Sequence, residues 1–148
     1  MEIIIQEDCP DIEVIIKCPK ATDEIQKLAS LLQREWHDMP GQKMPGTKDG
    51  QTFLVDRHDI LYFESVDKRY FIYTAADVYE TALKLYEIEE WLTAGIFFRS
   101  SKSQVINIKK IKSLCPEFGG RLEVVMENGE ILMVSRQYAK ILKERLGL

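Results

Sequence analysis

The feature that most constrains the fold is a succession of short segments rich in aromatic and β-branched residues. They read QTFLVD (51–56), DILYFES (59–65), RYFIYT (69–74) and DVYETA (77–82). Residues of this kind favour strands, and the polar residues between the segments are typical of turns. A short amphipathic helix is expected next, from Leu85 to Leu92. The chain is therefore predicted to be a mainly β protein of the α+β class, with short strands and a few short helices.

An Asn128-Gly129 pair predicts a hairpin near the C-terminus. It lies between RLEVVM (121–126) and ILMVSR (131–136), and Asn-Gly favours the positive φ angles of a type I′ turn. A two-residue loop would place Val124 opposite Met133. One face of the hairpin would then point to the core, and it would comprise Leu122, Val124, Met126, Ile131 and Met133.

The same register would place Arg121 directly opposite Arg136. Two arginines in that position repel each other unless an anionic group lies nearby. Glu123 would supply this charge as a diagonal neighbour. The alternative is a ligand that accepts hydrogen bonds from both arginines, such as a phosphate or the edge of a guanine.

The first forty residues are expected to form an extension of two strands and a helix. The strands are predicted at Ile3–Ile5 and Ile12–Ile16, and the helix begins near Thr22, a suitable N-cap residue. Its apolar stripe comprises Ile25, Leu28, Ala29, Leu32 and Trp36. This stripe packs on its own domain or forms a dimer surface. The predicted organisation is an extension (1–40), a Pro- and Gly-containing linker (41–50) and one domain (51–148).

Charge is unevenly distributed along the chain. The formal net charge is -4, yet residues 97–148 contain 10 Lys and Arg against 5 Asp and Glu. A basic segment of this kind suits an anionic partner such as a nucleic acid, and the alternative is an ordinary solvated surface.

Several classes of protein are disfavoured by what the sequence lacks. No run approaches the roughly 20 apolar residues of a membrane span, and the N-terminus does not resemble a signal peptide. Three cysteines without a C-x-x-C motif indicate free thiols in a reducing cytoplasm. The two histidines, His37 and His58, lie far apart, and no nucleotide-binding or hydrolase motif occurs. We therefore expect no catalysis, metal or cofactor, and no small-molecule substrate.

The segment FFRSSKSQVINIKKI (97–111) contains the most distinctive motif of the chain. Apolar residues at both ends enclose serines and a lysine, in the pattern F-x-R-x-x-K-S-x-V-I-N. This motif resembles the signature of the LytTR family of bacterial DNA-binding domains. DILYFES, YETALKLYEIEEWL (79–92) and NGEILMVSRQYAKILKERL (128–146) resemble other parts of that family in the same order. The resemblance covers roughly residues 50–147.

The resemblance implies small stacked antiparallel sheets whose loops enter successive major grooves of promoter DNA. The residues implied at the DNA are Lys68, Arg69 and Tyr70, Arg99, Ser101, Lys102 and Ser103, and Arg136. Arg136 suits guanine readout because its guanidinium can bond two acceptors at once. The lysines and other arginines suit phosphate contacts, although Arg99 would equally serve as a structural ion-pair partner. Asn107 is expected to fix the following turn by bonding backbone groups.

The implied protein is a cytoplasmic transcription regulator that binds double-stranded DNA as a homodimer. Control by phosphorylation of a receiver domain within the chain is not expected, and a regulatory membrane protein is a further candidate partner. The alternative is a protein-interaction module that binds an acidic or membrane-anchored partner without DNA.

Overall fold

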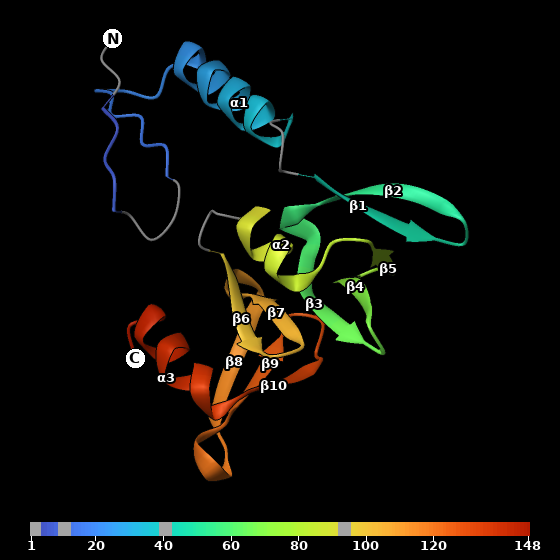
Figure 1. Ribbon diagram of the computed structural model, residues 1–148. Helices are drawn as coiled ribbons and strands as arrows, with labels where there is room; N and C mark the ends of the chain where they lie inside the picture. The colour runs from blue at the N-terminus through green and yellow to red at the C-terminus, as the bar shows by residue number, and fades with distance from the viewer. Residues whose placement is uncertain (1–3, 9–12, 39–42, 92–95) are drawn as a thin grey trace.

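A computed structural model describes residues 4–8, 13–38, 43–91 and 96–148, and it consists mostly of antiparallel sheet (Figure 1). The larger sheet has the strand order β2-β1-β5-β4-β3-β7-β6, and the smaller has the order β10-β9-β8. The mainly β prediction is confirmed, as are the strands expected between residues 51 and 82. The strands of the larger sheet are β1 (Lys43–Lys48), β2 (Gln51–Asp56), β3 (Ile60–Val66), β4 (Arg69–Thr74), β5 (Val78–Thr81), β6 (Phe97–Ser101) and β7 (Gln104–Asn107).

The remaining elements complete the domain and its N-terminal extension. The smaller sheet contains β8 (Ile111–Pro116), β9 (Leu122–Met126) and β10 (Ile131–Val134). The α-helices are α1 (Asp23–Asp38), α2 (Leu85–Trp91) and α3 (Arg136–Arg145). Three single 3-10 turns are η1 (Arg57–Asp59), η2 (Ile108–Lys110) and η3 (Phe118–Gly120).

Both faces of the larger sheet are buried around its β3, β7 and β6 strands. Successive residues of a strand point to opposite faces, so Val105 of β7 joins one apolar cluster and Ile106 the other. Helix α2 covers the first face through Leu85 and Ile88. The smaller sheet and α3 cover the second face. This three-layer packing fixes the ends of β6 and β7 between two cores, each buried apolar side chain contributing about 1.5–3 kcal/mol.

Asn107 ends β7 and fixes the turn that follows it. Its Oδ1 accepts a hydrogen bond of 3.0 Å from the backbone N–H of Lys109, and its Nδ2 donates one of 2.9 Å to the carbonyl of Ile60. The side chain is 1% exposed. The prediction that Asn107 bonds backbone groups is confirmed. Asp56 plays the corresponding part at η1, where its Oδ1 accepts from the N–H of His58.

The predicted hairpin forms, but its register differs by one residue. Leu132 pairs with Val124, and the loop has three residues because the N–H of Met126 donates to the carbonyl of Glu130. Of Asn128 and Gly129, only Gly129 has a positive φ (86°), as in a type I turn followed by a bulge. Leu132 and Val134 are consequently buried, whereas Ile131 and Met133, expected in the core, are exposed.

The register also removes the expected pairing of two arginines. Leu122 pairs with Val134, so the strands end before Arg121 and Arg136 would meet, and Arg136 begins α3. Opposed arginines therefore provide no argument for an anionic ligand in this structure.

Two predictions for the first fifty residues are wrong. Residues 4–8 and 13–22 contain no strand, so neither predicted N-terminal strand forms over the residues that the structure describes. Ile3 and Ile12 lie outside those residues. The segment expected as a linker contains β1, which pairs with β2 along its whole length. The helix is confirmed as α1, and the hydroxyl of Thr22 accepts a 3.5 Å bond from the N–H of Ile25.

Candidate nucleic-acid interface

Four connections between elements lie toward one end of the domain; in Figure 1 the loop of residues 117–121 is the lowest point, and the β3–β4 turn lies above it and to the right. Alternate connections of an antiparallel sheet lie at the same edge, which brings the β3–β4 and β6–β7 turns together. The N–H of Ser65 donates to the carbonyl of Ser103 at 2.8 Å, and the N–H of Ser135 donates to the carbonyl of Ser100 at 2.9 Å. We call these connections the lower end; they are residues 67–68, 102–103, 117–121 and 135–136.

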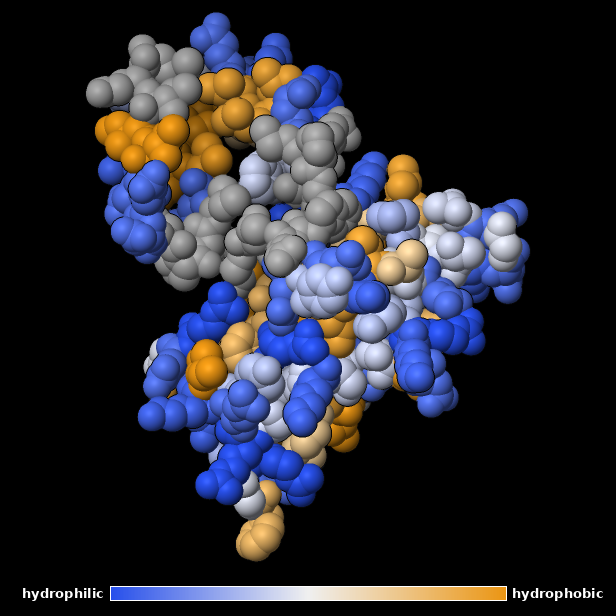
Figure 2. Space-filling view, viewed as in Figure 1, coloured by the Kyte–Doolittle hydropathy of each residue, from blue (hydrophilic) through white to orange (hydrophobic). Residues whose placement is uncertain are grey.

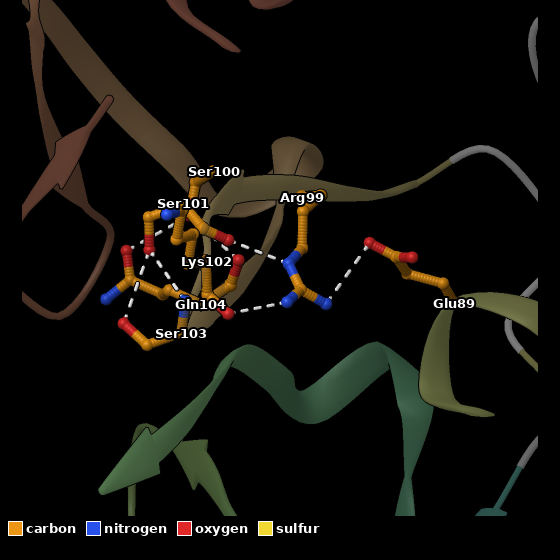
Figure 3. A network of polar contacts seen from close by, with 7 residues as sticks. All are labelled: Glu89, Arg99, Ser100, Ser101, Lys102, Ser103 and Gln104. Carbon is orange, nitrogen blue, oxygen red and sulfur yellow. Dashed lines mark hydrogen bonds and ion pairs between the residues drawn. The ribbon is translucent and has the colours of Figure 1, made fainter. Parts of the chain in front are cut away.

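Arg99 braces the β6–β7 turn from within (Figure 3). Its Nε donates to the carbonyl of Ser101 at 2.7 Å, and its Nη2 donates to the carbonyl of Lys102 at 2.5 Å. Its Nη1 lies 3.6 Å from a carboxylate oxygen of Glu89 in α2. The guanidinium is thus occupied by its own chain, and the geometry favours the structural alternative for Arg99 over a phosphate contact.

Serine hydroxyls complete the β6–β7 turn. Buried Ser100 donates to Gln104, whose side-chain oxygen lies 3.1 Å away. The N–H of Ser103 donates to the hydroxyl of Ser101 at 3.2 Å, and the two hydroxyls are 3.4 Å apart. Lys102 at the tip is exposed and makes no ion pair or side-chain hydrogen bond with the residues that the structure describes. The turn therefore presents one free ammonium group on a hydrogen-bonded support.

The β3–β4 turn presents a second lysine. Asp67 and Lys68 have φ angles of 51° and 62°, so the chain turns through two left-handed residues without a glycine. Lys68 is exposed, with no ion-pair partner in the described part of the chain. A non-glycine residue in this conformation is uncommon, and the strain is of the kind that is often found at binding sites.

The two residues after this turn are engaged with the domain itself. Arg69 makes two hydrogen bonds to the carboxylate of Glu80, at 3.0 and 2.5 Å, and its guanidinium lies 5.4 Å from the ring centre of Phe71. These hydrogen bonds lower the pKa of Glu80 from its ordinary value of 4.5. Tyr70 is half-buried against the apolar core. Of the three residues expected at the DNA from this turn, Lys68 alone projects unengaged among the described residues.

Arg136 lies at the start of α3 and packs over a glycine. A Cβ at Gly120 would lie 3.2 Å from Cγ of Arg136, and Gly120 has a φ of 79°. Both Arg136 and the neighbouring Arg121 are exposed, and neither has an ion-pair partner within the described ranges. The sequence prediction named Arg136 for the site and considered Arg121 only as its partner across the hairpin, and it did not name Gly120. The Gly-Gly pair at 119–120 was the available signal, because adjacent glycines mark a turn.

The described residues contain no group of three His, Cys, Asp or Glu side chains that would hold a metal ion. Within the same ranges, no helix has the length and apolar character needed to cross a membrane.

Comparison with known proteins identifies the fold and the family. A solved LytTr DNA-binding domain from Bacillus cereus superposes with a TM-score of 0.69; it is 24% identical, and the match covers 72% of this chain and 98% of that chain. This likeness shows the fold. A protein of Enterococcus faecalis named "Sensory transduction protein LytT" is 32% identical over 136 residues, 87% of this chain. This chain spans only 56% of that protein.

Another relative has a length closer to that of the present chain. It is an uncharacterized HTH-type transcriptional regulator of Staphylococcus aureus, 27% identical over 134 residues, and the match covers 90% of this chain and 88% of that protein. The family described as "LytTr DNA-binding domain" matches residues 50–147, about two thirds of the chain. The chain therefore belongs to the LytTR family of DNA-binding domains.

Proposed function

We propose that this protein is a bacterial transcription regulator that binds specific sequences of promoter DNA through its lower end. Family membership supports DNA as the partner, and relatives named as regulators support a role in transcription. The observation that carries the proposal is that the four connections of the lower end each carry an exposed cation: Lys68, Lys102, Arg121 and Arg136. Binding to the phosphate backbone requires such a group of unpaired positive charges.

The proposed roles follow from the contacts that each side chain already makes. Arg136 is free to offer two parallel donors to O6 and N7 of a guanine in the major groove. Lys102 and Lys68 each project a single positive charge, and we propose that they contact phosphates on either side of this guanine. The hydroxyls of Ser101 and Ser103 are close enough to the tip to accept or donate further bonds to the backbone or a base edge.

Arg99, Arg69 and Tyr70 are proposed to support the interface rather than to contact DNA. Arg99 holds two carbonyls of the β6–β7 turn, and Arg69 is held by Glu80. Breaking either set of bonds to reach a phosphate would cost interactions that the folded domain already has. Their substitution should therefore weaken binding by loosening the turns.

Further properties of the whole protein are part of the same proposal. We propose that two protomers bind repeated promoter elements. A cytoplasmic location and a regulatory membrane protein as partner are consistent with this function. Neither is needed for the DNA contact itself.

Selection of bound sequences from random duplex DNA tests the proposal directly. Arg136→Ala should weaken binding to the selected duplex by about 5- to 150-fold, equivalent to 1–3 kcal/mol, and should relax the preference at one base pair. Lys102→Ala should weaken all duplexes similarly and reduce the salt dependence of binding by about one phosphate contact.

Lys27→Ala is the matched control, because Lys27 is an exposed cation on α1, far from the lower end in Figure 1. It should leave affinity unchanged. Recovery of no preferred duplex by the wild-type protein would refute sequence-specific binding. It would favour the protein-interaction module instead.

A further inference from the structure

Phe118 projects from the lower end with almost its whole side chain in solvent. It is 92% exposed, more than any other large hydrophobic residue that the structure describes. Figure 2 shows the bottom of the molecule as mainly hydrophilic, with a small hydrophobic spot at its lowest point. A phenylalanine ring normally contributes to stability by being buried. At this exposure the ring contributes little to the stability of the domain, so its position calls for another explanation.

The loop that carries Phe118 is closed and well defined. The N–H of Glu117 donates to the carbonyl of Arg121 at 2.9 Å, which joins the two ends of the loop. Gly119 and Gly120 follow Phe118 with φ angles of 81° and 79°, a conformation that side chains with a Cβ rarely adopt. The ring is therefore presented at the tip of a short turn closed by a hydrogen bond, and little conformational entropy would be lost if it bound a partner.

The loop is coupled to the proposed base-reading residue. A Cβ placed on Gly120 would lie 3.2 Å from Cγ of Arg136. The backbone of the Phe118 loop therefore packs against the side chain of Arg136. Arg121 adds a second exposed cation, and Glu117 is the one acidic side chain of the loop. An apolar ring beside unpaired arginines matches a DNA surface, where apolar groups occur between phosphates. A typical protein interface would instead need a larger apolar area.

We propose that Phe118 makes an apolar contact with the DNA beside the base pair that Arg136 reads. The contact is with a thymine methyl group in the groove or with a base step that the ring partly unstacks. Phe118 would thereby add specificity at a position that no charged residue reads. This inference rests on the proposed function, because it takes DNA as the partner.

Affinity measurements on the selected duplex test the contact. Phe118→Ala should bind about 10-fold more weakly, while the slope of affinity against salt stays the same because no charge is removed. Phe118→Leu should retain most of the affinity. The matched control is Leu54→Ala on β2, a 69% exposed apolar side chain away from the lower end, which should bind as the wild type does. Since Phe118 is exposed, its substitution should not change the urea midpoint.

Modified DNA identifies the group that is touched. Replacing single thymines by uracil should weaken the wild type at one position and leave Phe118→Ala unaffected there, if a methyl group is contacted. A rise in 2-aminopurine fluorescence at a neighbouring step, absent with Phe118→Ala, would support unstacking.

The two proposals fail in different ways. Equal affinity of Phe118→Ala and wild type, with Arg136→Ala still weakened, would overturn the role of Phe118 alone. Absence of any preferred duplex for the wild type would overturn the proposed function as well.

Discussion

Asn107 provides the most direct test of how buried side-chain hydrogen bonds stabilise the domain. Replacing it by alanine removes two hydrogen bonds, to the carbonyl of Ile60 and from the N–H of Lys109. Ile60 is fully buried, so its carbonyl has no solvent to replace the lost donor. The N–H of Lys109 lies in a partly exposed turn, where water can substitute in part.

These losses set the magnitude of the effect. An unsatisfied buried carbonyl costs about 1–3 kcal/mol, and an ordinary hydrogen bond contributes about 0.5–1.5 kcal/mol. The free energy of unfolding should therefore fall by about 2–4 kcal/mol in Asn107→Ala. That is a large share of the roughly 5–15 kcal/mol by which domains are usually stable.

Urea unfolding followed by tryptophan fluorescence and circular dichroism measures this change. The matched control is Asn128→Ala, because Asn128 also accepts one backbone hydrogen bond, from Glu130 at 3.1 Å, but in an exposed turn. It should cost less than about 1 kcal/mol. DNA affinity of the folded fraction should be unchanged by Asn107→Ala. Equal costs for the two variants would refute the reasoning, and so would lost affinity in a variant that remains fully folded.

Two further predictions concern the β1–β2–β5 region and the support of the lower end. Gly46→Ala should destabilise the domain by about 1–3 kcal/mol, because the new Cβ would lie 2.6 Å from Cβ of Tyr79; thermal unfolding, with exposed Thr47→Ala as control, measures the loss. The pKa of Glu80 is lowered by the hydrogen bonds from Arg69, so the pair contributes stability above about pH 4.5 and loses it as pH falls through the lowered pKa. The stability difference between wild type and Arg69→Gln should accordingly shrink below pH 4.5 in urea titrations; a difference independent of pH would contradict this assignment.

The sequence was sufficient to locate β2 to β5 but not to align the C-terminal hairpin. Aromatic and β-branched runs identify β2 to β5 because few other structures suit such residues. In β10 the residues Ile131 to Val134 are all apolar, so the sequence contains no alternation that tells the buried face from the exposed one. The register depends on the backbone conformation of Asn128. A right-handed helical conformation gives a loop of three residues, and a left-handed one gives the two-residue loop of a type I′ turn.

The β1 strand shows the opposite difficulty. Pro45 and Gly46 make its sequence resemble a linker, although Asp49-Gly50 is a strong signal for a hairpin. These two residues have φ angles of 51° and 76°, as a type I′ turn requires. Pro45 is tolerated because β1 pairs with β5 only at Thr47, which leaves that side of Pro45 without a strand hydrogen bond to make.

The sequence named candidate site residues but could not show which of them the fold engages. Arg69 and Arg99 have the same chemistry as Arg136, and what distinguishes them is a carboxylate brought near by the fold, from Glu80 and Glu89 respectively. Such partners lie in other elements, so only the tertiary structure shows which cations are engaged.

The difference between engaged and unengaged arginines bears on how DNA would be recognised. Arg99 fixes the two carbonyls of the β6–β7 turn before any ligand arrives, so the backbone that carries Lys102 need not be ordered during binding. A turn that is ordered in advance loses less conformational entropy in the complex. In the proposed complex, Arg99 would thus increase affinity through Lys102 without touching DNA itself. The number of cations on and beside the lower end is therefore a poor measure of the number of DNA contacts in the proposed complex.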